Sequence, residues 1–469
     1  MKNNSKNRFV SSRRTFFKNN FLGALSASAC SSVIGVPTSF LLTGQALAND
    51  NNAKFTILSQ SKQGEPINCS GPMTFATNDN PAASLIDHPT LSELGETVRG
   101  TVNGVEYSAR DLEQSVDINI GGKIYKAARP WQELPQDFLN NLAGVWYRTG
   151  ANAHPEMPSV KKLKGALRDD INPNREEELA SAMAWDNADI LGTALKTPLV
   201  LSKEGMAGFS KGNPLTIYTP TQIQSLFAAT AGSHLDPAHY DNLYNQAIDS
   251  IYANLKENGT QKQRAFLDNH ALTRTQAQDI GDRMGNALAL IDGNDTVNQL
   301  RAAIAFMNLK LTPVVCVSHD FAGDNHGDIN LADEAARTLK GIDAMVQYWK
   351  MISDANLTNE VNWVTLDCFG RTAKRNKEGG RDHYGNMTLS FMHGSGINAG
   401  MYGGLETDSD NLPVATGINS QTGSKINPDI DAQSTLAAYG KTVIRASGVS
   451  EELTNTRVPA GKVIDSLFL

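Results

Sequence analysis

Carboxylate and imidazole side chains gather in three polar segments of the C-terminal third of the chain. The segments are "DFAGDNH" (320–326), "LDCFGRT" (366–372) and "NKEGGRDHYG" (376–385). Among their side chains that can bind metal ions are Asp324, His326, Asp367, Asp382 and His383. Mixtures of carboxylate oxygen and imidazole nitrogen suit zinc, manganese or similar divalent ions, and paired ions could activate water and hold a tetrahedral oxyanion. Each segment alone could equally be a polar turn or a capped loop.

Two arginines lie in the same segments. The guanidinium groups of Arg371 and Arg381 are planar forks that could clamp a phosphate or sulfate group. The three segments therefore combine the side chains of a metal site with side chains suited to a small anionic substrate.

The elements before these segments form a strand, helix, strand unit. "TPVVCVS" (312–318) is β-branched and apolar on both faces, as a central parallel strand should be. An apolar stripe predicts a helix from about Leu331 to Ser353, and "VNWVTLD" (361–367) is a second apolar strand. A right-handed crossover makes the two strands parallel, and ligands of such sheets collect at the carboxyl ends of the strands. We therefore expect the polar segments after both strands at one edge of the sheet.

The remaining sequence predicts a single α/β domain over residues 49–469. "AKFTILSQ" is typical of a first strand near residues 54–59, and short strands with Gly and Asn turns fill residues 76–130. The spacing of apolar residues makes 130–307 mainly helical, including "LPQDFLNNLAGVWY" (134–147), and this stretch could cover the sheet as a cap. The expected architecture has three layers, with a largely parallel central sheet and helical insertions.

The N-terminus carries an export signal. "SSRRTFFK" (Ser11 to Lys18) resembles the twin-arginine motif; a mildly apolar stretch follows, and "ALA" ends at Ala48, after which we expect cleavage. This motif predicts the twin-arginine translocation machinery as a partner and a periplasmic or extracellular location. Lipid attachment at Cys30 is the weaker alternative. Glycines and a proline interrupt the apolar stretch, and no other segment approaches the length of a membrane span.

Composition excludes several classes of function. Without the leader, 36 basic residues face 49 acidic ones, a formal charge of -13, which argues against nucleic acid or anionic membranes as partners. The mature chain keeps Cys69, Cys316 and Cys368, an odd number without a CxxC spacing. Neither a disulfide framework nor a thiolate zinc site is therefore expected.

The polar segments also carry a family resemblance. "TLDCFGRTAKRNKEGGRDHYG" (365–385), with "HDFAGDNH" (319–326) and the twin-arginine leader, resembles the exported bacterial family catalogued as domain of unknown function 1501. That family is grouped with the alkaline phosphatase and sulfatase superfamily. The resemblance implies an alkaline-phosphatase-like fold, a divalent cofactor and hydrolysis of phosphate or sulfate esters. Its implied metal ligands are Asp324, His326, Asp367 and His383. "RTGANAHPEMPSV" (148–160) resembles the His-bearing middle segment of the family.

The chain departs from the superfamily pattern in two places. After the first strand, where the superfamily has an Asp ligand and a nucleophile, "SQSKQGEPINCSGP" has no Asp, and its substitutes are Glu65, Asn68, Cys69 and Ser70. Cys368 stands where active members have a His beside the Asp. One complete metal site is therefore expected rather than two, and Cys69 and Ser70 are weak candidates for the nucleophile.

Two functions stay open at this stage. The ligand order and the export signal favour an exported, metal-dependent hydrolase of phosphate or sulfate esters. The departures favour a non-catalytic exported binding or surface-assembly protein on a degenerate hydrolase fold.

Overall fold

A computed structural model describes residues 53–168, 177–202, 208–228, 287–321 and 323–468. The chain divides into two compact units, of which the larger comprises residues 51–223 and 290–469. The other unit (1–50 and 224–289) lies almost entirely outside the described residues, as do the predicted leader and the central part of the predicted helical stretch.

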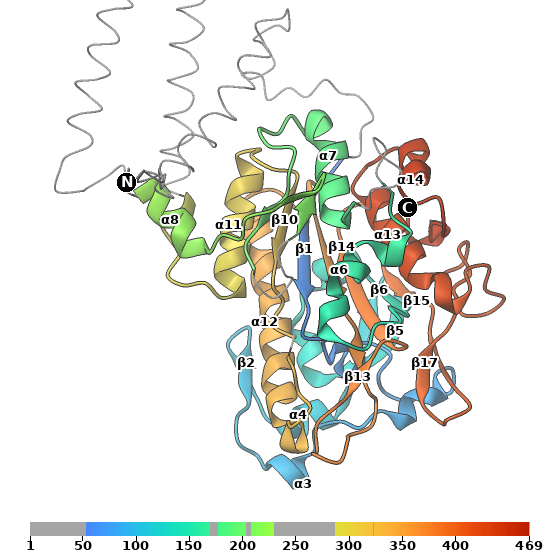
Figure 1. Cartoon of the computed structure of the whole chain (residues 1–469). Coiled ribbons are helices and arrows are strands. Elements are labelled where there is room, and N and C mark those ends of the chain that lie inside the picture. Colours follow the sequence, from blue (N-terminus) through green and yellow to red (C-terminus); the bar gives the residue numbers. More distant parts are fainter. Residues whose placement is uncertain (1–52, 169–176, 203–207, 229–286, 322, 469) are drawn as a thin grey trace, which may run out of the picture. The chain divides into compact units, whose positions relative to one another are not determined.

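A seven-stranded sheet forms the middle of the larger unit (Figure 1). Its order is β15-β6-β14-β11-β1-β10-β7. Four of the six neighbouring pairs are parallel, and β14 is antiparallel to both of its neighbours. The strands are β1 (Phe55–Ser61), β6 (Leu142–Tyr147), β7 (Leu199–Val200), β10 (Val314–Val317), β11 (Val361–Asp367), β14 (Thr388–His393) and β15 (Gly400–Tyr402). The predicted α/β class with a largely parallel sheet is confirmed.

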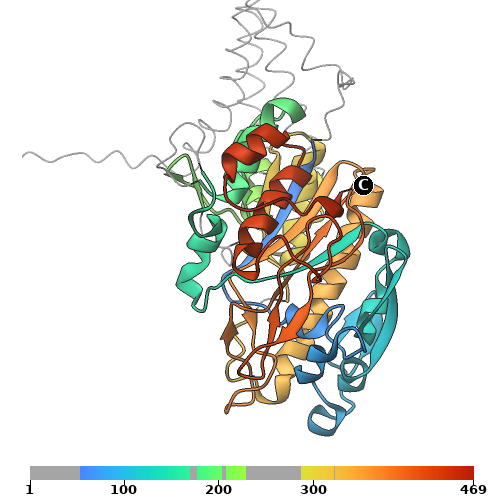
Figure 2. The same cartoon turned by 90° about the vertical axis from the view of Figure 1, so that its right-hand side faces the viewer.

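Helices cover both faces of this sheet (Figures 1 and 2). The described helices are α2 (Ile67–Ser70), α3 (Leu91–Leu94), α4 (Ala109–Glu113), α5 (Gln136–Leu139), α6 (Met157–Lys161), α7 (Leu179–Leu191), α8 (Pro220–Ala228), α11 (Thr296–Asn308), α12 (Ala332–Asp354), α13 (Thr435–Ala446) and α14 (Glu451–Arg457). The long helix α12 joins β10 to β11, and both strands are parallel to β1 between them. This is the predicted strand, helix, strand unit.

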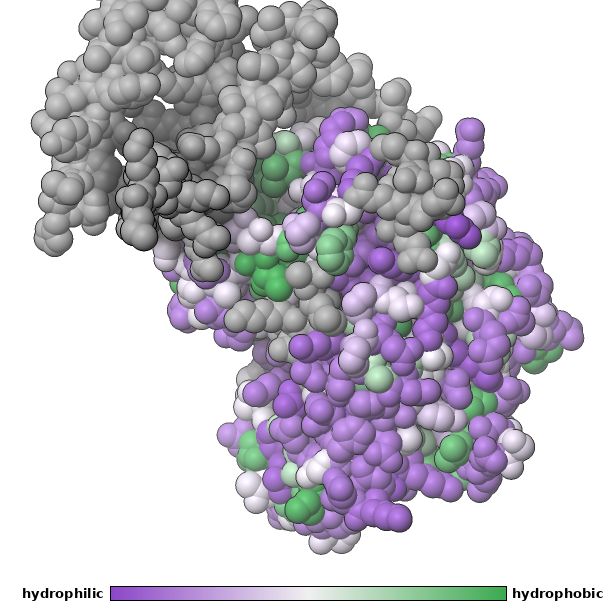
Figure 3. Space-filling view, viewed as in Figure 1, coloured by the Kyte–Doolittle hydropathy of each residue, from purple (hydrophilic) through white to green (hydrophobic). Residues whose placement is uncertain are grey.

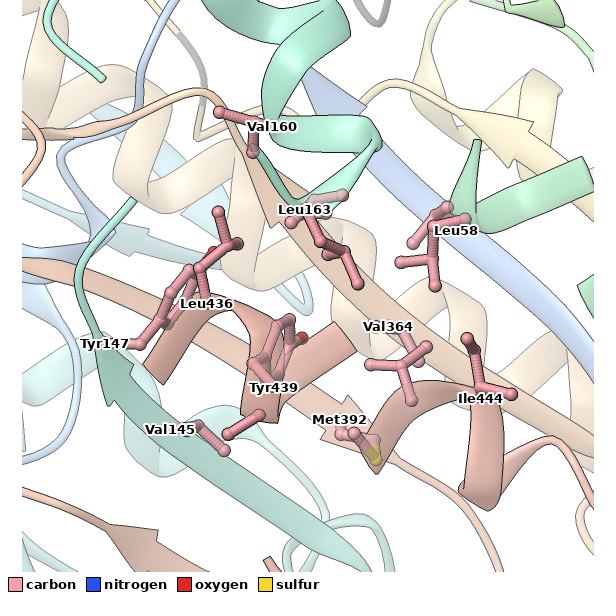
Figure 4. Packing of buried hydrophobic residues seen from close by; sticks show 14 of the residues in the cluster. Leu58, Val145, Tyr147, Val160, Leu163, Val364, Met392, Leu436, Tyr439 and Ile444 are labelled. Atoms are coloured by element: carbon pink, nitrogen blue, oxygen red, sulfur yellow. The ribbon is translucent and has the colours of Figure 1, made fainter. Parts of the chain in front are cut away.

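The alternation of side chains along the central strands decides which helices they meet. Leu58 of β1 and Val364 of β11 belong to one buried cluster with Leu436, Tyr439 and Ile444 of α13, as Figure 4 shows. The adjacent Trp363 points to the other face, where its ring lies 5.9 Å from that of Tyr348 on α12. Every residue of β1 and β11 is buried, as expected for central strands that are covered on both faces.

Short hairpins and ladders surround the sheet. The β excursion predicted for residues 76–130 contains two antiparallel hairpins, together with the short helices α3 and α4. The small strands are β2 (Gly100–Val102), β3 (Val105–Tyr107), β4 (Ser115–Ile120), β5 (Lys123–Ala128), β8 (Phe209–Ser210), β9 (Asn213–Pro214), β12 (Gly370–Arg371), β13 (His383–Tyr384), β16 (Leu405–Thr407) and β17 (Pro413–Ala415). The face in Figure 3 is mainly hydrophilic, with scattered apolar residues. None of the helices in the described part of the chain has the length and apolar character of a membrane span.

The helix predicted over residues 134–147 is wrong. Only Gln136–Leu139 is helical, and Leu142–Tyr147 is β6, a fully buried strand between β14 and β15. A short apolar run such as "LAGVWY" fits a helix or a buried strand equally well by periodicity. Packing decides here: a Cβ on Gly144 would lie 2.5 Å from Met401 Sδ of the neighbouring strand.

The core also contains a histidine that makes stability depend on pH. His393 is 1 % exposed and stacks on Phe138, and burial lowers its pKa to about 3. Between pH 6.5 and about 3, His393 is therefore protonated in the unfolded chain but neutral in the folded chain. The free energy of unfolding falls as pH falls through this window. Partial burial acts in the same direction on His88, whose pKa is lowered to about 4.

We predict that His393→Phe removes about 2 kcal/mol of the stability difference between pH 7 and pH 5, because the titrating group is gone. Urea unfolding at both pH values, compared with the unsubstituted chain, measures this difference. An unchanged difference would contradict the assignment to His393.

Candidate metal centre

The carboxyl ends of four parallel strands meet at one edge of the sheet. β6, β1, β10 and β11 all run in the same direction, since β14 is antiparallel to both β6 and β11. His154 follows β6, Glu65 follows β1, Asp324 and His326 follow β10, and Asp367 ends β11. This edge is where ligands bind in open parallel sheets.

Three side chains at this edge bring their ligand atoms together, and a fourth lies beside two of them. The ligand atoms of His154, Asp324 and His383 all lie within 4.8 Å of one another. His154 Nε2 is 3.4 Å from Asp324 Oδ2, and His383 Nε2 is 3.9 Å from Asp324 Oδ1. His326 joins them, because its Nε2 lies 3.5 Å from Asp324 Oδ1 and 2.8 Å from His383 Nε2. The predicted convergence of Asp324, His326 and His383 is therefore present.

The opposite nitrogen of two of these rings binds a backbone carbonyl. His154 Nδ1 is 2.7 Å from the carbonyl oxygen of Lys62, and His383 Nδ1 is 2.7 Å from that of Asn152. A carbonyl oxygen only accepts, so each ring must donate from Nδ1. In the neutral ring this leaves a lone pair on Nε2, and it faces Asp324. Burial lowers the pKa of His383, which favours this neutral form.

A carboxylate holds the third ring in the same way. His326 Nδ1 lies 2.8 Å from Asp382 Oδ1. The hydrogen bond from Asn376, followed by His326 itself, lowers the pKa of Asp382, so this carboxyl is ionised and accepts. Metal-bound histidines in proteins have this kind of partner on the other nitrogen, which fixes the tautomer and the ring orientation.

The resulting cluster requires a positive charge. Three Nε2 lone pairs and a carboxylate face one another, and the Nε2 atoms of His326 and His383 are only 2.8 Å apart. Two lone pairs at that distance repel each other unless a proton or a metal ion lies between or beside them. Asp324 adds negative charge, because Arg371 lowers its pKa even though partial burial acts in the opposite direction.

The donor set fits a divalent metal. Bonds of about 2.0–2.1 Å in a tetrahedral site give ligand-to-ligand distances of about 3.3–3.5 Å. Two of the distances from Asp324, 3.4 Å and 3.5 Å, match this value, and the third is 3.9 Å. The 2.8 Å between the Nε2 atoms of His326 and His383 is shorter than this value, so these two rings would have to move apart for both to bind one ion. Three imidazoles and one carboxylate suit zinc and similar ions.

The sequence prediction did not include His154 among the candidate ligands. The signal available was the resemblance of residues 148–160 to the His-bearing segment of the family. His154 reaches the sheet edge because it follows the strand β6. The sequence predicted a helix in place of β6, so nothing in the predicted topology brought His154 to this edge.

Asp367 lies in a separate, buried group. It is 1 % exposed, its Oδ2 lies 2.8 Å from His319 Nε2, and its Oδ1 accepts the N–H of Cys368. Burial, followed by the negative charge of Asp367, raises the pKa of the nearby Glu65 well above its usual range. Glu65 Oε1 has no hydrogen-bond partner in the described structure. Asp367 is thus not among the converging ligands, and its role in binding a second ion stays a prediction.

Both candidate substrate arginines are fully buried. The Arg371 guanidinium donates to the carbonyls of Gln63, Gly323 and Arg381 and lies 3.3 Å from Asp324 Oδ1. Arg381 pairs with Glu334 at 2.6 Å. These guanidinium groups bind protein atoms, and their contact with a substrate stays a prediction.

The candidate nucleophiles lie on the short helix α2. Burial raises the pKa of Cys69 to about 12, so its thiol is protonated at neutral pH. A protonated thiol is a weak nucleophile. The Ser70 hydroxyl is buried and has no hydrogen-bond partner in the described part of the chain.

The family comparison agrees with the resemblance noted above. Residues 254–464 match the model of a family described as "Protein of unknown function (DUF1501)". The match supports the DUF1501 family. It includes Asp324, His326 and His383, whereas His154 precedes the region that DUF1501 covers. No curated protein matches the chain.

We predict that Asp382→Asn weakens Zn²⁺ binding about 10- to 100-fold, because an amide no longer fixes the donor tautomer of His326. Isothermal titration of the full chain with Zn²⁺ measures the effect. Asp189→Asn is the control, since Asp189 is exposed and pairs with Lys196 on the surface. Equal Zn²⁺ affinity of the Asp382 and Asp189 variants would contradict this role.

Proposed function

We propose that this chain is an exported, metal-dependent hydrolase whose divalent ion is held by His154, Asp324, His326 and His383. One observation carries the proposal: three Nε2 atoms face a carboxylate while each Nδ1 is committed to an acceptor. A cluster of donors arranged in this way is suited to hold a divalent cation.

A divalent ion bound there would lower the pKa of a coordinated water and polarise an ester oxygen. The protein's own residues orient the site. Asp382 and the carbonyls of Lys62 and Asn152 hold the rings, and Arg371 keeps Asp324 ionised.

The site is open to a substrate. The side chains of Asp324 and His326 are 48 % and 36 % exposed. An open cavity of about 690 Å³ adjoins Asp324 and is lined further by Asn325, Asp328 and Ile329. This volume lies within the range of small-molecule sites.

Phosphate or sulfate esters are the proposed substrate class. This part of the proposal rests on the resemblance to the alkaline phosphatase and sulfatase superfamily and on the suitability of the metal centre for hydrolysis.

Specific observations favour the second candidate, a non-catalytic binding or surface-assembly protein. Arg371 and Arg381 are both fully buried, so neither presents its guanidinium group to an ester. The Cys69 thiol is protonated, and Cys368 replaces the superfamily His. The metal would then serve stability or ligand binding without turnover.

We predict that the full chain, isolated from the cytoplasm, contains one divalent ion per chain by elemental analysis. His154→Ala and His383→Ala should each weaken metal binding more than about 100-fold, because a ligand is lost rather than a supporting group. Asp117→Asn, which affects only an exposed ion pair with Lys126, should keep the metal.

Turnover separates the two candidate functions. The hydrolase predicts cleavage of p-nitrophenyl phosphate or sulfate by the metal-loaded chain and its loss in Asp324→Asn. A metal-loaded chain that cleaves neither ester supports the binding protein, and a chain without metal contradicts the centre itself.

Export is proposed from the sequence of residues 1–48, which lie outside the described residues. We predict that replacing Arg13 and Arg14 together by Lys keeps the chain in the cytoplasm, because the twin-arginine pathway requires the arginine pair. Cell fractionation with antibody detection measures the location. Export of this variant at the normal level would contradict the proposal.

A further inference from the structure

Two loops that carry the proposed ligands approach each other at backbone distance. Asp324 and His326 lie on the loop after β10, and His383 follows the "NKEGG" turn. A Cβ on Gly380 would lie 1.9 Å from the Asn325 carbonyl oxygen, so only glycine fits at this contact. The next residue, Arg381, donates its backbone N–H to the same oxygen at 3.0 Å.

A buried carboxylate ties the two loops together. Glu334, in the first turn of α12, is 1 % exposed. It accepts from Arg381 Nε at 2.6 Å and from a second Arg381 nitrogen at 3.0 Å. It also accepts from Asn325 Nδ2 at 3.1 Å. Asn325 lies between two of the ligands, and Arg381 lies two residues before the third.

The partners of this carboxylate are themselves fixed. Arg381 is fully buried and donates further to the backbone carbonyls of Thr372, Ala373 and Asp87. Asp328 accepts the N–H groups of Asp333 and Glu334, which attaches the end of the ligand loop to the start of α12.

We propose that Glu334, Asn325 and Arg381 form a clamp that positions the metal ligands before the ion binds. None of the three lies among the converging ligand atoms, so each acts through its neighbours: Asn325 through Asp324 and His326, and Arg381 through Asp382 and His383. Because the fold already holds both loops, little ordering is left for metal binding to impose. This inference rests on the proposed metal centre.

The test uses Co²⁺ as the probe, because its visible absorption reports both affinity and ligand geometry. Metal-free full chain and its Glu334→Gln variant are titrated well below their unfolding temperatures. Glu334→Gln should weaken Co²⁺ binding about 10- to 100-fold and change the absorption bands, as loss of outer supporting groups does in other sites. Asn325→Ala removes only one hydrogen bond of the clamp and should act in the same direction, but less.

A second buried pair provides the matched control. Asp186 and Arg457 join α7 to α14 through two contacts of 2.8 Å and 2.5 Å, and both side chains are buried to a similar degree. Asp186→Asn should lower the unfolding temperature, as Glu334→Gln does, but keep the Co²⁺ affinity and spectrum of the unsubstituted chain. If Co²⁺ binding changes in Glu334→Gln and Asn325→Ala but not in Asp186→Asn, the change does not result from a general loss of stability.

Three outcomes overturn the inference. In the first, folded Glu334→Gln binds Co²⁺ with unchanged affinity and spectrum. In the second, Asp186→Asn loses affinity to the same extent. If Glu334→Gln does not fold, Asn325→Ala decides, and unchanged affinity of that variant is the third. Absence of Co²⁺ binding by the unsubstituted chain is a different result: it refutes the proposed metal centre, and the clamp with it.

Discussion

The structure depends on a constraint of charge at the edge of the sheet. Three imidazoles direct Nδ1 to fixed acceptors, so their Nε2 atoms lie near the Asp324 carboxylate. Added positive charge, from a proton or from the proposed ion, is favourable there, and the fold holds the rings in place through buried contacts. The close contact at Gly380 and the buried Glu334–Arg381 pair hold the two loops that carry these side chains against each other.

Strand topology explains how His154 and His383 come together although they are 229 positions apart in the sequence. Parallel strands end at a common edge, and the antiparallel β14 allows β6 to run in the same direction as β11. The segment after β6 therefore brings His154 to the loop that β10 supplies. A short ladder then completes the site, because β12 pairs with β13 and Arg371 lies opposite His383. Arg371 links this ladder to Asp324 at 3.3 Å.

The sequence predicted the part of the site that lies within one continuous strand, helix, strand unit. The unit β10–α12–β11 has strong periodicity and clear turns, so its strands, its helix and the edge that carries Asp324 and His326 followed from the pattern. His154 did not follow, because "LAGVWY" fits two periodicities and its strand partners are distant in sequence. The burial of Arg371 and Arg381 could not be predicted either. An arginine in a polar segment is usually exposed, and only tertiary contacts show that these two bind backbone carbonyls.

The polar side chains at this edge form an outer group, which comprises His154, Asp324, His326 and His383, and a buried inner group, which includes Glu65 and Asp367. The difference between the two groups bears on how many ions the edge can hold. The inner carboxylates, Glu65 and Asp367, receive positive charge from the protein itself, since Arg371 lowers the pKa of both and His319 lies 2.8 Å from Asp367. Burial nevertheless raises both pKa values, which favours protonated rather than metal-binding forms. The outer group is more exposed and carries a carboxylate that remains ionised, because Arg371 lowers the pKa of Asp324. For the proposed metal centre, this difference favours one ion, bound by the outer group, rather than two.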